Sequence, residues 1–140
     1  MIHHIAIYGK GGVGKTTLAA NIGASLIEAG FTVALVGCGS KSDSASLLNN
    51  GFPMPNVLDQ IRNNSPVTAE SVVHIGFKGV RCVELGDLGY SGGCTSAEVS
   101  RAIRELKRLH VFEQINPDFV LYDISGDGSN AVLHAVIRQV

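Results

Sequence analysis

The segment from Gly9 to Thr16 reads Gly-Lys-Gly-Gly-Val-Gly-Lys-Thr, which matches the phosphate-binding loop pattern G-x-x-x-x-G-K-[ST]. An apolar run over residues 2–8 precedes the loop, and a helical pattern from Thr16 to Ala29 follows it. This strand–loop–helix order is the setting that the pattern requires, because the loop N–H groups and the helix N-terminus together form an anion site. The alternative is a glycine-rich turn that precedes a helix.

Different residues of the loop are expected to bind different parts of a nucleotide. The Lys15 ammonium can reach the terminal phosphates, and the Thr16 hydroxyl can ligate Mg²⁺. Lys10 adds a second cation, so the segment resembles the deviant Walker A subclass, whose early lysine reaches across a dimer interface; a solvated loop lysine is the alternative. The predicted nucleotide-binding residues are Gly9, Lys10, Gly11, Gly12, Val13, Gly14, Lys15, Thr16 and Thr17.

The rest of the chain alternates between strand and helix patterns. A near-continuous apolar run at residues 31–36 is typical of a strand buried on both faces of a parallel sheet, and residues 80–85 and 119–124 predict two further strands. Hydrophobic residues make up 45% of the 140 residues and charged residues 16%, as in buried-sheet α/β proteins. We therefore expect one α/β domain over residues 1–140, a P-loop NTPase with a parallel sheet flanked by helices.

Several helices are expected between these strands. In the first, Leu18, Ile22 and Leu26 are spaced as one apolar face. Short helices are expected at residues 57–61 and 68–75, and a short helix with a loop at residues 40–56. The Thr95-x-x-Glu98 capping box predicts a further helix, whose apolar face is Val99, Ile103, Leu106 and Leu109.

Asp123 closes the apolar strand over residues 119–124, where a Walker B carboxylate holds Mg²⁺ directly or through water. On its own, such an aspartate is as often a strand-end turn residue. With a phosphate-binding loop in the same chain, the magnesium role is favoured. The Ser125-Gly126-Asp127-Gly128 segment that follows is where a nucleotide-sensing switch would lie. Asp43 is a weaker candidate, because loop carboxylates are usually only solvated.

Charge and cysteine content exclude other classes of protein. The net charge of −1 gives no electrostatic basis for binding nucleic acid or membrane. The N-terminus runs straight into a strand without a signal-peptide pattern, and no apolar run is long enough to span a bilayer. Three widely spaced cysteines argue against a disulfide framework and for a reducing compartment, so we expect a cytoplasmic protein.

Four segments together resemble the nitrogenase iron protein family and its close relatives, the ATP-dependent reductases of chlorophyll and tetrapyrrole biosynthesis. The resemblance runs in register from Ile5 to Arg138, and the Min and Par partition ATPases share only its loop. The matching segments are the loop Gly9–Thr16, Val36-Gly37-Cys38 with Lys41-Ser42-Asp43-Ser44, Gly79–Glu84 with Gly93-Cys94, and Phe119–Asp123 with Gly126-Asp127.

The resemblance implies a homodimer that binds two Mg-ATP and one shared [4Fe–4S] cluster, and in which ATP hydrolysis gates electron transfer to a partner reductase. It implies catalytic roles for Lys10, Asp43 and Asp127, with Asp127 linking nucleotide to cluster. Thr16 and Asp123 would serve the magnesium ion. Cys94 would be a cluster ligand, and its place before the predicted Thr95 cap supports this, because a helix N-terminus lowers a thiol's pKa. A small loop cysteine without a ligand is the alternative.

The chain departs from the family at several of these positions. Asn130 stands where the family has its second cluster cysteine, so a dimer would offer two thiolates instead of four, which makes a [4Fe–4S] cluster doubtful. Gly39 and Ser40 replace an Asp-Pro pair in the first switch, which predicts slow hydrolysis at best. Ala97 replaces an arginine on the partner-docking face. The family's chains are also much longer, so the sequence is identified as a truncated or divergent member.

Three functions remain open from the sequence. The first is an ATP-dependent, electron-donating reductase component of the iron-protein type. The second is a nucleotide-binding regulatory or degenerate paralogue that has lost the cluster. The third is a partition-type ATPase, which would be favoured by a membrane helix or a basic DNA-binding patch that the sequence does not display.

Overall fold

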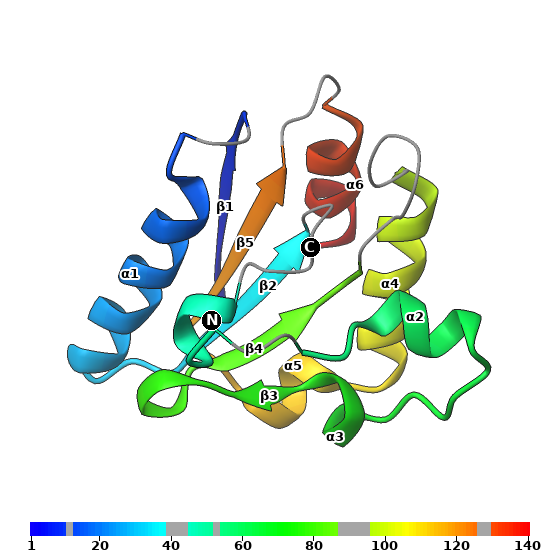
Figure 1. The fold of residues 1–140 in the computed structure, drawn as a ribbon, viewed down its shortest axis with the longest axis horizontal. Helices are drawn as coiled ribbons and strands as arrows, with labels where there is room; N and C mark the ends of the chain where they lie inside the picture. Colours follow the sequence, from blue (N-terminus) through cyan, green and yellow to red (C-terminus); the bar gives the residue numbers. More distant parts are fainter. Residues whose placement is uncertain (11–12, 39–44, 52–53, 87–95, 126–129) are drawn as a thin grey trace.

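In the computed structural model, a five-stranded sheet lies between two layers of helices (Figure 1). The structure describes residues 1–10, 13–38, 45–51, 54–86, 96–125 and 130–140. The strand order across the sheet is β1-β5-β2-β4-β3. The strands are β1 (His3–Gly9), β2 (Val33–Cys38), β3 (His74–Ile75), β4 (Arg81–Glu84) and β5 (Phe119–Ser125).

Helix α1 covers one face of the sheet, while α4 and α6 cover the other (Figure 1). Helices α5 and α6 had no counterpart among the expected elements. No helix in the described part of the chain is both long and apolar enough to cross a membrane. The helices are α1 (Lys15–Glu28), η1 (Ser46–Leu48), α2 (Val57–Arg62), α3 (Ala69–Val72), η2 (Phe77–Gly79), α4 (Ser96–Arg108), α5 (Val111–Ile115) and α6 (Ala131–Gln139).

The sheet is parallel except at β3, which pairs antiparallel with β4. The expected helix over residues 68–75 was therefore wrong in its second half. A capping box between Thr68 and Ser71 starts α3, but Val73 is extended (φ −98°, ψ 123°) and the chain enters β3. Only a tight turn separates β3 from β4, with Lys78 at φ 48° and Gly79 at φ 92°. A turn of this length joins antiparallel strands, because a parallel pair needs a long crossover.

Strand β2 is buried at every residue and alternates between the two layers. Val33 and Leu35 belong to the core cluster under α1, while Ala34 and Val36 belong to the cluster under α4 and α6. This alternation follows from the period of two residues in a strand. It confirms the prediction that the apolar run is a strand buried on both faces.

The predicted apolar face is buried in α4 but is partly exposed in α1. In α4, Val99, Ile103 and Leu106 are buried as expected. In α1, Leu18 is 54% exposed, so its predicted place in the core was wrong. The residues of α1 that are buried are Ala19, Ala20 and Gly23. A Cβ atom added at Gly23 would lie 3.6 Å from Leu121 of β5, so small residues let α1 approach the sheet closely.

Strand β1 lies at one edge of the sheet, and among the described residues it pairs only with β5. Its side chains are mostly exposed, Ile5 and Tyr8 among them.

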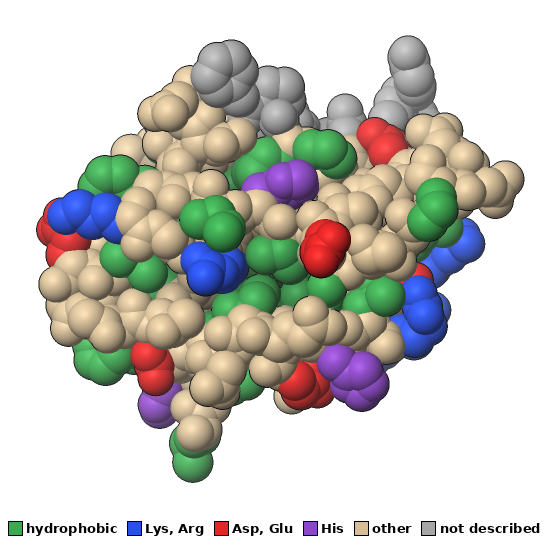
Figure 2. Space-filling model, turned by 90° about the horizontal axis from the view of Figure 1, so that it is seen from below, with side chains coloured by type: hydrophobic (Ala, Val, Ile, Leu, Met, Phe, Trp, Pro, Cys, Tyr) green, Lys and Arg blue, Asp and Glu red, His purple; other side chains and the backbone are tan. Residues whose placement is uncertain are grey.

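Figure 2 shows a different face of the molecule, on which Lys and Arg, Asp and Glu, and His lie interspersed with apolar side chains. Charges of both signs are therefore mixed on that face instead of gathered into one field.

Gly86 follows β4 where the backbone takes φ 154° and runs close to α2. A Cβ atom there would lie 2.8 Å from the Leu58 Cβ. We expect Gly86→Ala to lower the free energy of unfolding by about 2–4 kcal/mol, because overpacking adds to backbone strain. Urea denaturation measures this change.

Gly30→Ala is the matched control, since Gly30 also has a positive φ (94°) but no atom within 4 Å of its added Cβ. It reports backbone strain alone. Equal losses in the two variants would mean that the Leu58 contact contributes nothing.

Candidate nucleotide-binding site

The phosphate-binding loop joins the end of β1 to the start of α1, beside the carboxyl end of β5. Gly9 is the last residue of β1 and pairs in register with Ser125. Gly14 has φ 91° and occupies the N-cap position of α1, without a side chain to cap the helix. Glycine adopts this left-handed conformation at little cost, and the uncapped N–H groups of the first turn then point toward the loop.

Asp123, on β5, contacts two residues at the start of α1. Its carboxylate is 1% exposed, near the end of β5. One oxygen lies 3.2 Å from the Lys15 Nζ, and the other accepts a hydrogen bond of 2.8 Å from the Thr16 hydroxyl. The structure therefore brings these three predicted site residues together, and their roles in holding nucleotide and metal stay predictions.

This donor set fits a magnesium-bound nucleotide. Carboxylate and hydroxyl oxygens are the ligands that Mg²⁺ takes in proteins, usually together with phosphate oxygens. Lys15 is 12% exposed on its side chain, so its charge is held mostly out of solvent at the mouth of the loop. The first turn of α1 contains no acidic residue that would repel phosphate.

The remaining loop residues are less constrained. Lys10, Val13 and Thr17 are exposed, and Val13 lies near the end of β1, 3.7 Å from where a Gly9 Cβ would stand. Five of the predicted site residues lie outside the described residues, so their roles stay predictions. They are Gly11, Gly12, Asp43, Cys94 and Asp127.

Asn130 is tied to the far end of the chain. It occupies the N-cap position of α6, and its Oδ1 accepts a 2.5 Å hydrogen bond from the Tyr8 hydroxyl. Its side chain does not cap the helix. This bond spans 122 positions of sequence, so no local pattern could have predicted it.

Glu84 is a second residue that the sequence analysis missed. It is 1% exposed, and its Oε1 accepts a 2.8 Å hydrogen bond from the Ala45 N–H. The bond links the end of β4 to the residue directly after the 39–44 segment. The available signal was a carboxylate at the end of a predicted strand, which needs a partner when buried.

Two cysteines lie in the described part of the chain. Cys38 and Cys82 are both buried within strands. Burial, together with the nearby charge of Glu84, raises the pKa of the Cys82 thiol to about 12. A thiol that stays protonated is a poor metal ligand. Among the residues that the structure describes, no group of three or more His, Cys, Asp or Glu could hold a metal ion.

Comparison with known proteins identifies the family. Residues 3–136 match the family described as 4Fe-4S iron sulfur cluster binding proteins, NifH/frxC family. The chain belongs to this family. It is 44% identical to nitrogenase iron protein 2 of Paenibacillus durus, over 90% of the chain and 43% of that protein. It is 45% identical to the nitrogenase iron protein of Methanococcus voltae, over 86% of the chain and 44% of that protein.

The chain thus spans less than half the length of these iron proteins. Solved structures of similar fold include the septum site-determining protein MinD of Pyrococcus horikoshii in complex with Mg-ADP. It has a TM-score of 0.68 and 22% identity, over 98% of this chain and 54% of that one. Cobyrinic acid a,c-diamide synthase of Mycobacterium smegmatis, with bound ADP and magnesium, has a TM-score of 0.66 and 24% identity, over 96% and 55%. These likenesses confirm the α/β P-loop NTPase fold.

Proposed function

We propose that this member of the iron-protein family binds Mg-ATP through Lys15, Thr16 and Asp123. The observation that carries the proposal is the buried Asp123 carboxylate, which contacts both the loop lysine and the loop threonine. The bound Mg²⁺ would neutralise phosphate charge. Lys15 would turn from Asp123 to the terminal phosphates, while Asp123 keeps the Thr16 hydroxyl oriented toward the metal.

The function we propose is that of an ATP-hydrolysing, electron-donating component acting as a cytoplasmic homodimer with a partner reductase. Membership of a [4Fe–4S] family supports it. In a dimer, the exposed Lys10 would contact the partner's nucleotide. Asp43 and Asp127 would position the attacking water and couple the nucleotide to a cluster held at Cys94.

A second candidate is a nucleotide-binding regulatory protein without a cluster. One observation favours it. The residue at the second cysteine position is Asn130, an amide, and its oxygen already accepts a hydrogen bond from Tyr8. A partition-type ATPase has only a shared fold in its support, at 22% identity to MinD.

Lys15→Ala tests the shared part of both main candidates. We expect the variant to lose ATP and ADP affinity by about a hundredfold or more, because no other described side chain places a cation beside Asp123. Isothermal titration calorimetry with Mg²⁺ measures the loss.

Lys78→Ala is the matched control, since Lys78 pairs with Glu28 at the surface, away from the loop. It should bind nucleotide like the wild type. Wild-type affinity in Lys15→Ala would refute the proposed site.

A further inference from the structure

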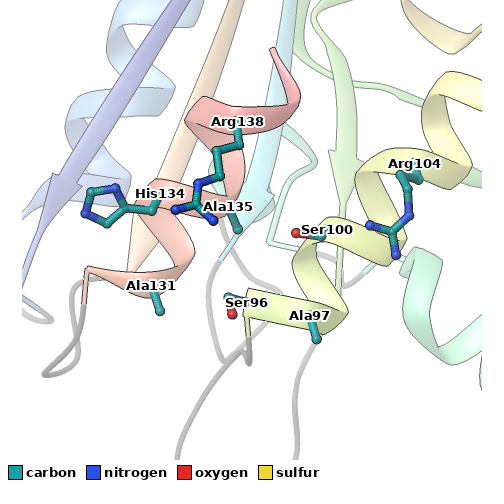
Figure 3. Close-up of a pocket in the computed structure, with 8 residues that line it drawn as sticks. All are labelled: Ser96, Ala97, Ser100, Arg104, Ala131, His134, Ala135 and Arg138. Atoms are coloured by element: carbon teal, nitrogen blue, oxygen red, sulfur yellow. The ribbon is translucent and has the colours of Figure 1, made fainter.

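A cavity of about 560 Å³ lies between α4 and α6. Figure 3 shows Ser100 projecting from α4 toward α6, and Arg138 extending from α6 beside Ala135. His134 points away from α4 in the same view. Cavities of roughly 300–1,000 Å³ are the usual size of small-molecule sites. The lining residues are Ser96, Ala97, Ser100, Arg104, Ala131, His134, Ala135 and Arg138.

Among the described residues that line the cavity, the charged side chains are positive. Two arginines line it, Arg104 from α4 and Arg138 from α6, and none of the lining residues that the structure describes is acidic. Neither guanidinium forms an ion pair within the described part of the chain. By contrast, Arg62 pairs with Glu98, and Arg108 pairs with Glu105. The two arginines that share the cavity are therefore available to an outside anion.

The rest of the lining suits the same kind of ligand. The hydroxyls of Ser96 and Ser100 can donate hydrogen bonds, and three alanines supply an apolar surface. The first turns of both helices also contribute to the wall, through Ser96 of α4 and Ala131 of α6. Their N–H dipoles add positive potential to that of the arginines.

This cavity is separate from the nucleotide site. Lys15 and Thr16 belong to α1, which covers one face of the sheet, whereas α4 and α6 cover the other (Figure 1). None of the cavity residues contacts Asp123 through a hydrogen bond that the structure gives. An anion held here would be additional to the nucleotide.

We propose that the α4–α6 cavity binds a small molecule through a phosphate or diphosphate group, held by Arg104 and Arg138. The planar guanidinium forms paired hydrogen bonds to phosphate oxygens, which favours phosphate over a single-point anion. The serine hydroxyls complete the contacts. The cavity exceeds the volume of one phosphate, and its alanines face the uncharged body of the ligand.

The test uses inorganic pyrophosphate as the probe, with the full chain carrying Lys15→Ala so that the phosphate-binding loop does not compete. Calorimetry should give one site per chain. Adding Arg104→Gln and Arg138→Gln together should weaken binding at least about tenfold, and each substitution alone should weaken it severalfold. Citrate, a polycarboxylate, should bind more weakly than pyrophosphate.

Arg101→Gln is the matched control, because Arg101 is an exposed arginine of α4 that does not line the cavity. It should leave affinity unchanged. The proposal is overturned if Lys15→Ala protein does not bind pyrophosphate, if Arg101→Gln weakens binding as much as the cavity variants, or if citrate binds as tightly. Circular dichroism checks folding, and the single variants decide the matter if the double variant is unfolded.

Discussion

Replacing Asp123 with Asn is expected to abolish the contribution of Mg²⁺ to nucleotide affinity and to destabilise the protein. The carboxylate is buried and contacts both Lys15 and Thr16. An amide would lose the charge that balances Lys15 and would turn an N–H group toward one of these two donors. Breaking a buried ion pair by removing one partner costs about 3 kcal/mol or more. Urea denaturation should detect this loss.

The nucleotide effect has a separate readout. In the wild type, Mg²⁺ should strengthen ADP binding, because Thr16 and Asp123 help to hold the metal at the phosphates. In Asp123→Asn, calorimetry with and without Mg²⁺ should give the same affinity within about twofold. A variant that keeps the full magnesium effect would remove Asp123 from the metal site.

Two further variants distinguish the loss of the Lys15–Asp123 ion pair from a non-specific effect of removing a carboxylate. Asp118→Asn lies just before β5 at its opposite end, where the carboxylate accepts the Thr32 N–H. It should leave nucleotide binding unchanged. Adding Lys15→Ala to Asp123→Asn should restore part of the lost stability, since the unpaired ammonium is then gone. No recovery would mean that Lys15 is not the group left uncompensated.

The parts of the fold that were predictable from the sequence are those fixed by short segments. The loop from Gly9 to Thr16 and the apolar strand ending at Asp123 each have a local pattern, and parallel strands place their carboxyl ends at one edge. The topology of a parallel sheet was therefore enough to predict that Lys15 and Asp123 lie close together. The resemblance to the iron protein family rested on the same segments and was confirmed by the family match.

What the sequence did not predict depends on contacts between distant segments. The spacing of Leu18 predicts that it belongs to an apolar helical face. However, α1 packs closely against β5 through its small residues Ala19, Ala20 and Gly23, and Leu18 is left exposed to solvent. The sequence of residues 74–75 is compatible with a helix, but in the structure these residues pair with β4 as a strand. The α4–α6 cavity needs the crossing of two helices, one of which had no expected counterpart.

The last prediction concerns the iron–sulfur cluster, where the change from Asn130 to Cys should have an all-or-none effect. Expressed alone, the wild type should not retain a stable [4Fe–4S] cluster, because Cys94 alone gives a dimer two thiolates and leaves two irons without protein ligands. Asn130 stands at the N-cap of α6, whose first turn has no acidic residue. A cysteine there would meet the positive end of the helix, which favours its thiolate.

After anaerobic reconstitution, Asn130→Cys should hold about four irons per dimer and give a reducible signal in electron paramagnetic resonance, while the wild type gives neither. Adding Cys94→Ser should abolish the gain. Asn63→Cys is the matched control, since Asn63 is an exposed asparagine at the end of α2. Tyr8→Phe accounts for the hydrogen bond that Asn130→Cys removes, an exposed contact worth about 0.5–1.5 kcal/mol. A stoichiometric, reducible cluster in the wild type would refute the prediction, and it would favour the electron-donating function over the regulatory one.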